Sequence, residues 1–335
     1  MAGNIVTSFL LELKKEQGEL PRDLHITRKA CALVAISGGK VIKMQEPEVH
    51  HCPLFTSLFC FESINRDTIE KKFEKQAQDW GMFTCDRVVC DEKIIVPFGA
   101  SEMIMYALKR DIIDSAVIVC EGAGTVITSN PGVVQGIGAY MNGLFYTTPI
   151  PEVIKRIENN GGIVLSKKDA RIDQLEGVRE ASEMGYKKIA VTVRGDEAIL
   201  DKLRHEPVAD KVIILSICNT GIDTAQAEHI SNYADLAWAC ASKEIREIAG
   251  PKAILQVGMK IPVFVLTKKG LDFISSYSSD AILRDLLEDT GQKHYITANR
   301  FKEGSIKINM GRFSVFLYET GKLPVETEDG PGPLI

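Results

Sequence analysis

The sequence lacks any run of about 20 consecutive apolar residues, which is the length that a membrane-spanning helix needs. Its N-terminal part holds one short apolar run, from Ile5 to Leu11, which is too brief and wrongly flanked for a secretory signal. These absences argue against an exported or membrane-embedded protein. We therefore expect a cytoplasmic protein without a membrane partner.

The sequence also lacks an excess of positive charge. Lys and Arg total 40 against 45 Asp and Glu, and the formal net charge is −5. The basic residues include scattered pairs, such as Lys71-Lys72 and Lys187-Lys188, which are typical of solvated helix and loop positions. Because nucleic-acid binding depends on concentrated positive charge, we predict no nucleic-acid partner.

Common cofactor signatures are missing as well. Gly122-x-Gly124 has no glycine three residues later, and no Gly-Lys-Ser/Thr follows, which excludes the dinucleotide fingerprint and the phosphate loop of NTPases. None of the eight cysteines forms a C-x2-C pair. In a cytoplasmic protein they are reduced thiols or ligands rather than disulfides.

What the sequence does contain, from Asp114 to Ser278, is an alternation of β-branched apolar runs with amphipathic segments. The runs span residues 115–120, 188–193, 212–217, 236–240 and 262–267. Continuous apolar runs suit strands covered on both faces, and pairs such as Asp173 with Glu176 mark helix starts between them. The alternation predicts a doubly wound α/β fold with a mainly parallel sheet and helices on both faces.

The flanking regions carry different patterns. A Gly38-Gly39 turn predicts a β-hairpin near the N-terminus, and Asp67 with Glu70 predicts a helix start. After residue 278 we expect a helix at 281–287 and a hairpin of the runs 305–310 and 313–319. The resulting division is an N-terminal hairpin and helix region (1–97), an α/β core (98–278) and a small β-rich C-terminal extension (279–335). The acidic, Pro/Gly-rich tail at 326–333 is expected to be loose.

A glycine-rich stretch, residues 121–138, begins where the first predicted core strand ends. Glycines there allow backbone N–H groups to approach an anion, and the crevice of an open α/β sheet lies beyond the carboxyl ends of its strands. The stretch is expected to be a ligand-binding loop; the alternative is that its glycines only let a long loop fold tightly. The candidate ligand-binding residues are Glu121, Gly122, Gly124, Thr125, Gln135, Gly136 and Gly138, together with Asn219, Thr220 and Gly221 after the run 212–217.

Three cysteines stand at or just after the ends of predicted parallel strands: Cys120, Cys218 and Cys240. If the strands are parallel, all three thiols lie at the edge of the sheet where ligands bind. Cys218 also precedes a predicted helix start, which lowers a thiol pKa. We take the three as candidate nucleophiles or cluster ligands, the alternative being small residues that complete the strand ends.

Cys52 is a weaker candidate for a metal site. It lies in His50-His51-Cys52-Pro53, and a Cys-Pro step is frequent at iron–sulfur ligands while thiolate with imidazole suits zinc. Its separation from Cys60 matches neither site type. An iron–sulfur cluster or zinc therefore stays open beside the plainer interpretation of buried thiols and surface histidines.

Eight short motifs occur along the chain in the order Cys52–Leu54, Phe98–Glu102, Gly122–Val126, Gln135–Gly138, Thr148–Ile150, Ala190–Thr192, Ala239–Ser242 and Pro262–Phe264. Together they resemble the motifs of the methanogenesis marker protein 8 family. The resemblance covers roughly residues 38–270. It implies an anaerobic cytoplasm and a link to methyl-coenzyme M reductase or to the thiol coenzymes of that pathway, but no particular reaction.

Three functions follow from these patterns. The first is an accessory or maturation protein of methanogenic coenzyme metabolism that binds a small anionic or phosphorylated ligand near cysteine thiols. The second is a transferase or lyase that depends on a cysteine or an iron–sulfur cluster. The third is an interaction module that docks on the reductase or its assembly factors through the C-terminal β segment. Whether the chain is an enzyme stays open at this point.

Overall fold

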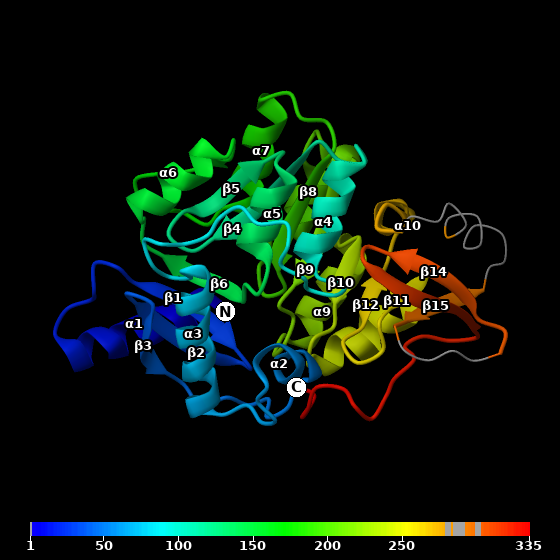
Figure 1. The fold of residues 1–335 in the computed structure, drawn as a ribbon, viewed down its shortest axis with the longest axis horizontal. Helices are drawn as coiled ribbons and strands as arrows, with labels where there is room; N and C mark the ends of the chain where they lie inside the picture. Colours follow the sequence, from blue (N-terminus) through cyan, green and yellow to red (C-terminus); the bar gives the residue numbers. More distant parts are fainter. Residues whose placement is uncertain (1, 279–282, 284–291, 299–302) are drawn as a thin grey trace.

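The computed structural model describes residues 2–278, 283, 292–298 and 303–335, and it contains two β-sheets (Figure 1). The small sheet is antiparallel, in the order β3-β2-β1-β6. The large sheet has the order β14-β15-β13-β11-β12-β10-β9-β8-β4-β5-β7. Among the described residues, no helix is both long and apolar enough to cross a membrane.

The strands of the large sheet are β4 (Ser115–Cys120), β5 (Gly124–Thr128), β7 (Ile163–Val164), β8 (Ile189–Arg194), β9 (Val212–Ile217), β10 (Leu236–Trp238), β11 (Leu255–Val257), β12 (Val263–Val265), β13 (Lys293–Thr297), β14 (Ile306–Met310) and β15 (Phe313–Thr320). Its centre, β4-β8-β9-β10, is parallel, and β11 is parallel to β13. The other neighbouring pairs are antiparallel. The sheet is therefore mixed, and the prediction of a mainly parallel sheet is corrected.

The run 262–267 shows why that prediction went too far. It contains β12, which is buried along its length as expected, but β12 runs antiparallel between β10 and β11. An interior strand of either direction is covered on both faces, so a continuous apolar run identifies an interior strand without giving its direction.

Helices cover both faces of the large sheet, as predicted. One face carries α4 (Ala100–Lys109), α5 (Pro131–Gly138), α6 (Pro151–Asn159) and α10 (Lys268–Ser275); the other carries α7 (Gln174–Glu183), α8 (Leu200–His205) and α9 (Thr224–Tyr233). Successive residues of β9 enter opposite cores: Ile213 and Leu215 join the first, Ile214 the second. This two-sided burial explains the continuous apolar runs of the sequence.

The small sheet consists of β1 (His25–Lys29), β2 (Ala32–Ser37), β3 (Lys40–Met44) and β6 (Gly143–Thr147). The predicted hairpin with its Gly38-Gly39 turn is confirmed as β2 and β3. Helix α1 (Ala2–Gln17) packs on one side of the sheet, and α2 (Pro53–Phe59) and α3 (Arg66–Trp80) pack on the other. Because β6 comes from the middle of the chain, the N-terminal region and the α/β core share this sheet.

Helix starts follow the capping chemistry that the sequence suggested, with one shift. Asp173 caps α7 and Asp223 caps α9, each by accepting a hydrogen bond from the backbone N–H three residues later. Helix α3 begins two residues earlier than Asp67 implied, because Asn65 is the N-cap and forms the capping box with Thr68.

The C-terminal part continues the large sheet. Strand β13 pairs with β11, and the predicted hairpin of β14 and β15 is confirmed. The helix expected at 281–287 lies outside the described residues except Leu283. The tail is not loose along its length: Gly332 pairs with His51, and the Ile335 N–H donates to the Ala241 carbonyl at 2.9 Å. The tail thus reaches both α2 and the loop after β10.

Candidate functional site

The glycine-rich stretch is a β-hairpin followed by a helix, packed inside the protein. Cys120 ends β4, Gly124 begins β5, and the stretch ends in α5. Gly124 has a φ of +72°, and a Cβ there would lie 2.1 Å from the Ala170 carbonyl oxygen. Close approach of the backbone at residue 170 thus requires this glycine, and ligand binding by the stretch stays a prediction.

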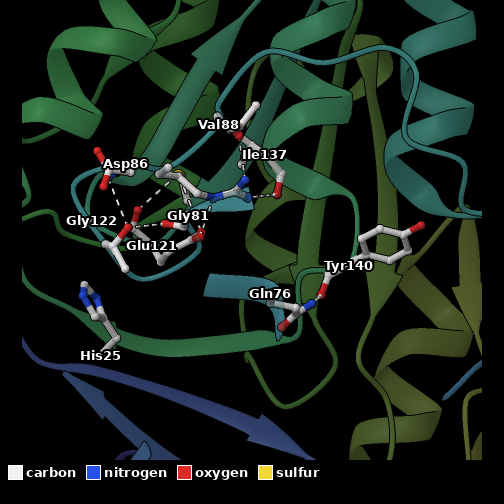
Figure 2. Close-up of polar contacts among 12 residues, drawn as sticks. His25, Gln76, Gly81, Asp86, Val88, Glu121, Gly122, Ile137 and Tyr140 are labelled. Carbon is white, nitrogen blue, oxygen red and sulfur yellow. Dashed lines mark hydrogen bonds and ion pairs between the residues drawn. The ribbon is translucent and has the colours of Figure 1, made fainter. Parts of the chain in front are cut away.

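Glu121 is matched within the protein. Its carboxylate accepts a hydrogen bond from Arg87 Nε at 2.5 Å, and both side chains are buried. The same guanidinium donates to the carbonyl oxygens of Val88 and Ile137 at 2.6 and 2.9 Å (Figure 2). A buried charge with this many partners is a structural ion pair, so Glu121 leaves little capacity for a ligand.

The other predicted residues of the stretch also have internal partners. Thr125 Oγ1 donates to Gln174 Oε1 at 2.7 Å, and Gln135 Nε2 donates to the Ile94 carbonyl at 2.7 Å. Gly122 N–H donates to Thr147 Oγ1 at 2.7 Å. The remaining two glycines differ: a Cβ at Gly136 would lie 2.7 Å from the backbone of Cys90, whereas Gly138 lines a cavity.

The residues after β9 brace the ends of two strands. Asn219 Nδ2 donates to the carbonyls of Ser216 and Trp238 at 3.1 and 2.8 Å. Thr220 Oγ1 accepts from the Ala241 N–H at 3.2 Å, and Thr220 lines a cavity. Gly221 has a φ of +73°. These contacts fix where the chain turns beyond the sheet edge.

The strand-end cysteines lie at one edge of the parallel centre, but in different surroundings. Cys120 is the last residue of β4 and is completely buried in the core, where its Sγ donates to the Glu121 carbonyl at 3.2 Å. Cys218 follows β9 directly, and Cys240 follows β10 by two residues. Both line the same two cavities, so the edge brings two of the three thiols together.

We call these two adjoining cavities the thiol cleft. Their volumes are about 180 and about 210 Å³. They share the lining residues Lys29, Leu54, Met141, Asn142, Cys218, Trp238 and Cys240. The cleft thus lies where the ends of β9 and β10 meet β1 and α2. A larger, mostly apolar cavity of about 420 Å³ adjoins it at Leu54 and Trp238.

Cys52 joins this cleft from the N-terminal region. It is the N-cap residue of α2 and lines the larger of the two cavities together with Cys31. The charge of Cys52 also acts on Cys240. Even so, the described part of the chain contains no group of three or more His, Cys, Asp or Glu residues placed to hold a metal ion.

Burial favours the protonated form of three cleft thiols, those of Cys31, Cys218 and Cys240. It raises the pKa of Cys218 to about 12, with the nearby Cys240 acting in the same direction, and the pKa of Cys31 to about 11. Burial, and then Cys52, raises the pKa of Cys240. The lowered thiol pKa that we expected at Cys218 is therefore corrected, because desolvation outweighs the helix start that follows it.

Two polar donors on residues that line the cleft lack hydrogen-bond partners in the described structure. Lys72 Nζ and Asn142 Nδ2 are buried, and neither finds a hydrogen-bond partner among the described residues. Both residues line the 180 Å³ cavity, and so does Lys29. Lys72 Nζ lies 3.8 Å from the ring centroid of Phe73, and Lys29 Nζ lies 4.9 Å from that of Phe55.

The sequence reasoning missed these donors and expected Lys72 to be solvated. Its neighbour Lys71 is exposed and pairs with Asp67 at 2.7 Å, whereas Lys72 is 1% exposed. The overlooked signal is helical spacing. Lys72 falls three residues after Ile69 and four before Gln76, on the buried face of α3.

Arg28 lines the larger cavity of the cleft and belongs to a cluster of charged residues near the end of β8. Arg28 Nη2 donates to the Cys218 carbonyl at 3.0 Å, and its Nη1 lies 3.5 Å from Asp196. Asp196 also pairs with Arg194, which donates to the Leu144 carbonyl at 2.7 Å. Burial raises the pKa of Glu197, which lies beside Arg194.

Together these features define an α/β protein with a cleft at the carboxyl edge of its parallel strands, lined by cysteines and lysines. The chain belongs to the family described as "Uncharacterized protein conserved in archaea (DUF2099)", whose model matches residues 25–277. All the residues named above as lining the thiol cleft lie within this range. A protein of Methanocaldococcus jannaschii, "Uncharacterized protein MJ0054", is 43% identical over 251 residues, which cover 74% of this chain and 88% of that protein.

Among solved structures, the chain is similar to one chain of the F420-reducing NiFe hydrogenase complex from Methanosarcina barkeri. The sequences are 13% identical, and the TM-score is 0.21. The match covers 66% of this chain and 56% of the hydrogenase chain. A likeness at this score carries no argument about fold or function.

Proposed function

We propose that this chain binds a small anionic organic ligand in the thiol cleft, as an accessory or maturation protein of methanogenic coenzyme metabolism. One observation carries the proposal: two buried donors on the same cavity, Lys72 Nζ and Asn142 Nδ2, lack partners in the described protein. The ligand site that we propose is therefore the thiol cleft rather than the glycine-rich stretch beside it.

The energetics support an anion at this position. A buried donor without a partner costs about 1–3 kcal/mol, and more if it is charged. A sulfonate, phosphate or carboxylate would satisfy both donors, and Lys29, which lines the same cavity, adds a positive group. The place is also where open α/β sheets hold their ligands, beyond the carboxyl ends of the strands.

The proposed context comes from the motifs and the relatives. The motifs that resemble methanogenesis marker protein 8 include Cys52–Leu54 and Ala239–Ser242, which lie at the cleft. A relative in Methanocaldococcus jannaschii agrees with an archaeal setting. Coenzyme M carries a sulfonate and a thiol, so it would place an anion at the lysines and sulfur near Cys218 and Cys240.

The experiment is anaerobic titration calorimetry with coenzyme M, using K72M and K71M as a matched pair. K71M should bind like the parent chain, because Lys71 is exposed and is not among the residues that line the cleft. K72M should bind about 10- to 100-fold more weakly, the loss expected for a charge-assisted hydrogen bond. Equal affinities for K72M and the parent chain would remove the cleft from the proposal.

The two other functions receive less support. The protonated state of Cys218 and Cys240 disfavours a thiolate nucleophile. An interaction module at the C-terminal segment is disfavoured because β13 is built into the large sheet and Leu317 of β15 belongs to its core. Neither function explains the unpartnered donors.

A further inference from the structure

We propose that Lys72 is a nucleophile that condenses with the carbonyl carbon of a small 2-oxo acid held in the thiol cleft. The inference rests on the proposed function in one respect, namely that the cleft admits a small acid. It goes further by giving the cleft a reaction and its ligand a chemical class.

The geometry separates Lys72 from every group that would keep its amine engaged. Its side chain leaves α3 and lines a cavity whose other walls include Phe55, Leu58 and Phe59. No carboxylate in the described chain pairs with it, because Glu121, whose charge reaches Lys72, is held by Arg87. The Lys72 side chain therefore lines the cavity, and its amine has no hydrogen-bond partner among the described residues.

The protonation state supports the same role. Burial lowers the pKa of Lys72 well below 10.5, and the charge of Lys29 lowers it further. Glu121 and Cys218 act in the opposite direction with smaller effect. An apolar pocket and a neighbouring cation are the two features that turn a lysine into an amine nucleophile, because they leave its lone pair free.

The remaining cleft groups suit the rest of a 2-oxo acid. Lys29 can receive the carboxylate, and Asn142 Nδ2 can donate to the carbonyl oxygen, since both line the cavity that Lys72 lines. In the reaction, the Nζ lone pair forms a bond to the carbonyl carbon. The carbonyl oxygen takes both amine protons and leaves as water, so the C=O bond is replaced by C=N without any oxidant or reductant.

The test uses glyoxylate as the probe and sodium cyanoborohydride, which reduces an imine to a stable carboxymethyl-lysine. Peptide mapping by mass spectrometry compares Lys72 with the adjacent, exposed Lys71 in the same full-length protein. At pH 7 Lys72 should be labelled more than about 10-fold faster, because an ordinary lysine is almost wholly protonated there. Labelling of Lys72 at or below the rate of Lys71 would overturn the proposal.

A pH series distinguishes a reactive amine from one that is only well exposed to the probe. Between pH 7 and 9 the rate at Lys71 should rise close to 10-fold per pH unit, while that at Lys72 should rise much less. Parallel rises at both lysines would contradict the inference. The variant K72R, which keeps a cation but cannot form the imine, should lose the label at this position and leave that of Lys71 unchanged.

A calorimetric titration with oxalate, which has no ketone, separates this inference from the proposed function. Binding of oxalate without selective labelling of Lys72 would overturn the nucleophile and leave the anion site standing. Selective labelling without binding of coenzyme M would support the nucleophile and count against the proposed coenzyme.

Discussion

Lys71 and Lys72 are adjacent lysines whose surroundings differ completely, because successive helical residues point about 100° apart. Lys71 pairs with Asp67 in solvent, and Lys72 lies against Phe73 in the interior. A buried amine without a carboxylate is costly. The two residues also provide a built-in comparison for every experiment on the cleft.

The stability of the fold should depend on pH through Lys72. Its folded-state pKa lies below the unfolded value of 10.5, so the unfolded chain binds the extra proton between these two values. Stability due to this group therefore rises with pH across that window and is lowest beneath it. At pH 7, K72M should be more stable than the parent chain, because it removes a buried amine whose protonated form is destabilised by burial.

Urea denaturation of K72M and the parent chain at pH 7, 8.5 and 10 measures this effect. The difference in unfolding free energy should shrink as the pH rises. A difference that does not vary with pH would mean that packing, rather than protonation, governs the site.

Glu121 should act on stability rather than on binding. E121Q leaves the Arg87 guanidinium buried without its counter-charge, which costs about 3–5 kcal/mol in a buried pair. The matched change at an exposed pair, D67N, should leave the denaturation midpoint almost unchanged. Guanidinium denaturation gives both values, and a midpoint for E121Q equal to that of D67N would refute a structural role for the ion pair.

For individual residues, the sequence predicted the position of two cleft thiols but not the other polar groups that line the cleft. Cys218 and Cys240 were correctly put at one sheet edge, because parallel strands end together. Lys29 and Asn142 could not be found this way. They come from β1 and the segment before β6, whose contact with β9 depends on tertiary packing between distant segments.

Among the elements, the β4–β5 hairpin shows why glycine spacing alone does not identify a ligand site. A stretch rich in glycine is equally compatible with an anion cradle and with tight backbone packing. Here Gly124 lies against the Ala170 carbonyl, and Gly136 lies against the segment at Cys90. Only the partner segments decide between the two, and these are distant in the sequence.

Substitution at Gly124 separates backbone strain from steric overlap. Gly124 and Gly161 have φ values of +72° and +78°, but a Cβ at Gly161 meets nothing within 4 Å. G161A should cost about 1 kcal/mol from its backbone conformation alone. G124A should cost about 1–3 kcal/mol more, because its Cβ would overlap the backbone at residue 170. Equal thermal-unfolding midpoints for the two variants would exclude the close packing described for the hairpin.

Strand positions and helix caps were largely predictable, whereas strand direction was not. Asp173 and Asp223 each cap a helix through a hydrogen bond to a backbone N–H three residues later, so these helix starts can be predicted from the local sequence. The direction of β12 is set by the length and path of the connections around it, including the turn that returns the chain from β11. The apolar pattern within a strand gives no information about that path, and so none about the direction of the strand.

On the scale of the whole molecule, the tail connects the C-terminal part to the cleft. Gly332 pairs with His51 next to α2, Ile335 pairs with Ala241 beside β10, and Pro331 lines the cleft. Removal of residues 331–335 should leave the sheets folded. It should also increase hydrogen exchange at the His50 and His51 amides, whose acceptor is the Gly332 carbonyl.

Hydrogen exchange followed by mass spectrometry measures this change. Amides of β8 and β9, which form hydrogen bonds with each other and not with the tail, serve as the internal reference. Unchanged protection at His50 and His51 in the truncated chain would show that the tail does not hold the entrance of the cleft.

The late arrival of β6 has a consequence for synthesis on the ribosome. Strand β1 is covered on one side by β2 within a few residues, but its other side pairs with β6, with His25 opposite Thr147. Until that part has emerged, the nascent hairpin presents an open strand edge to other chains. Fragments that stop before residue 143 should therefore self-associate, and co-translational chaperones have their clearest target in the first three strands.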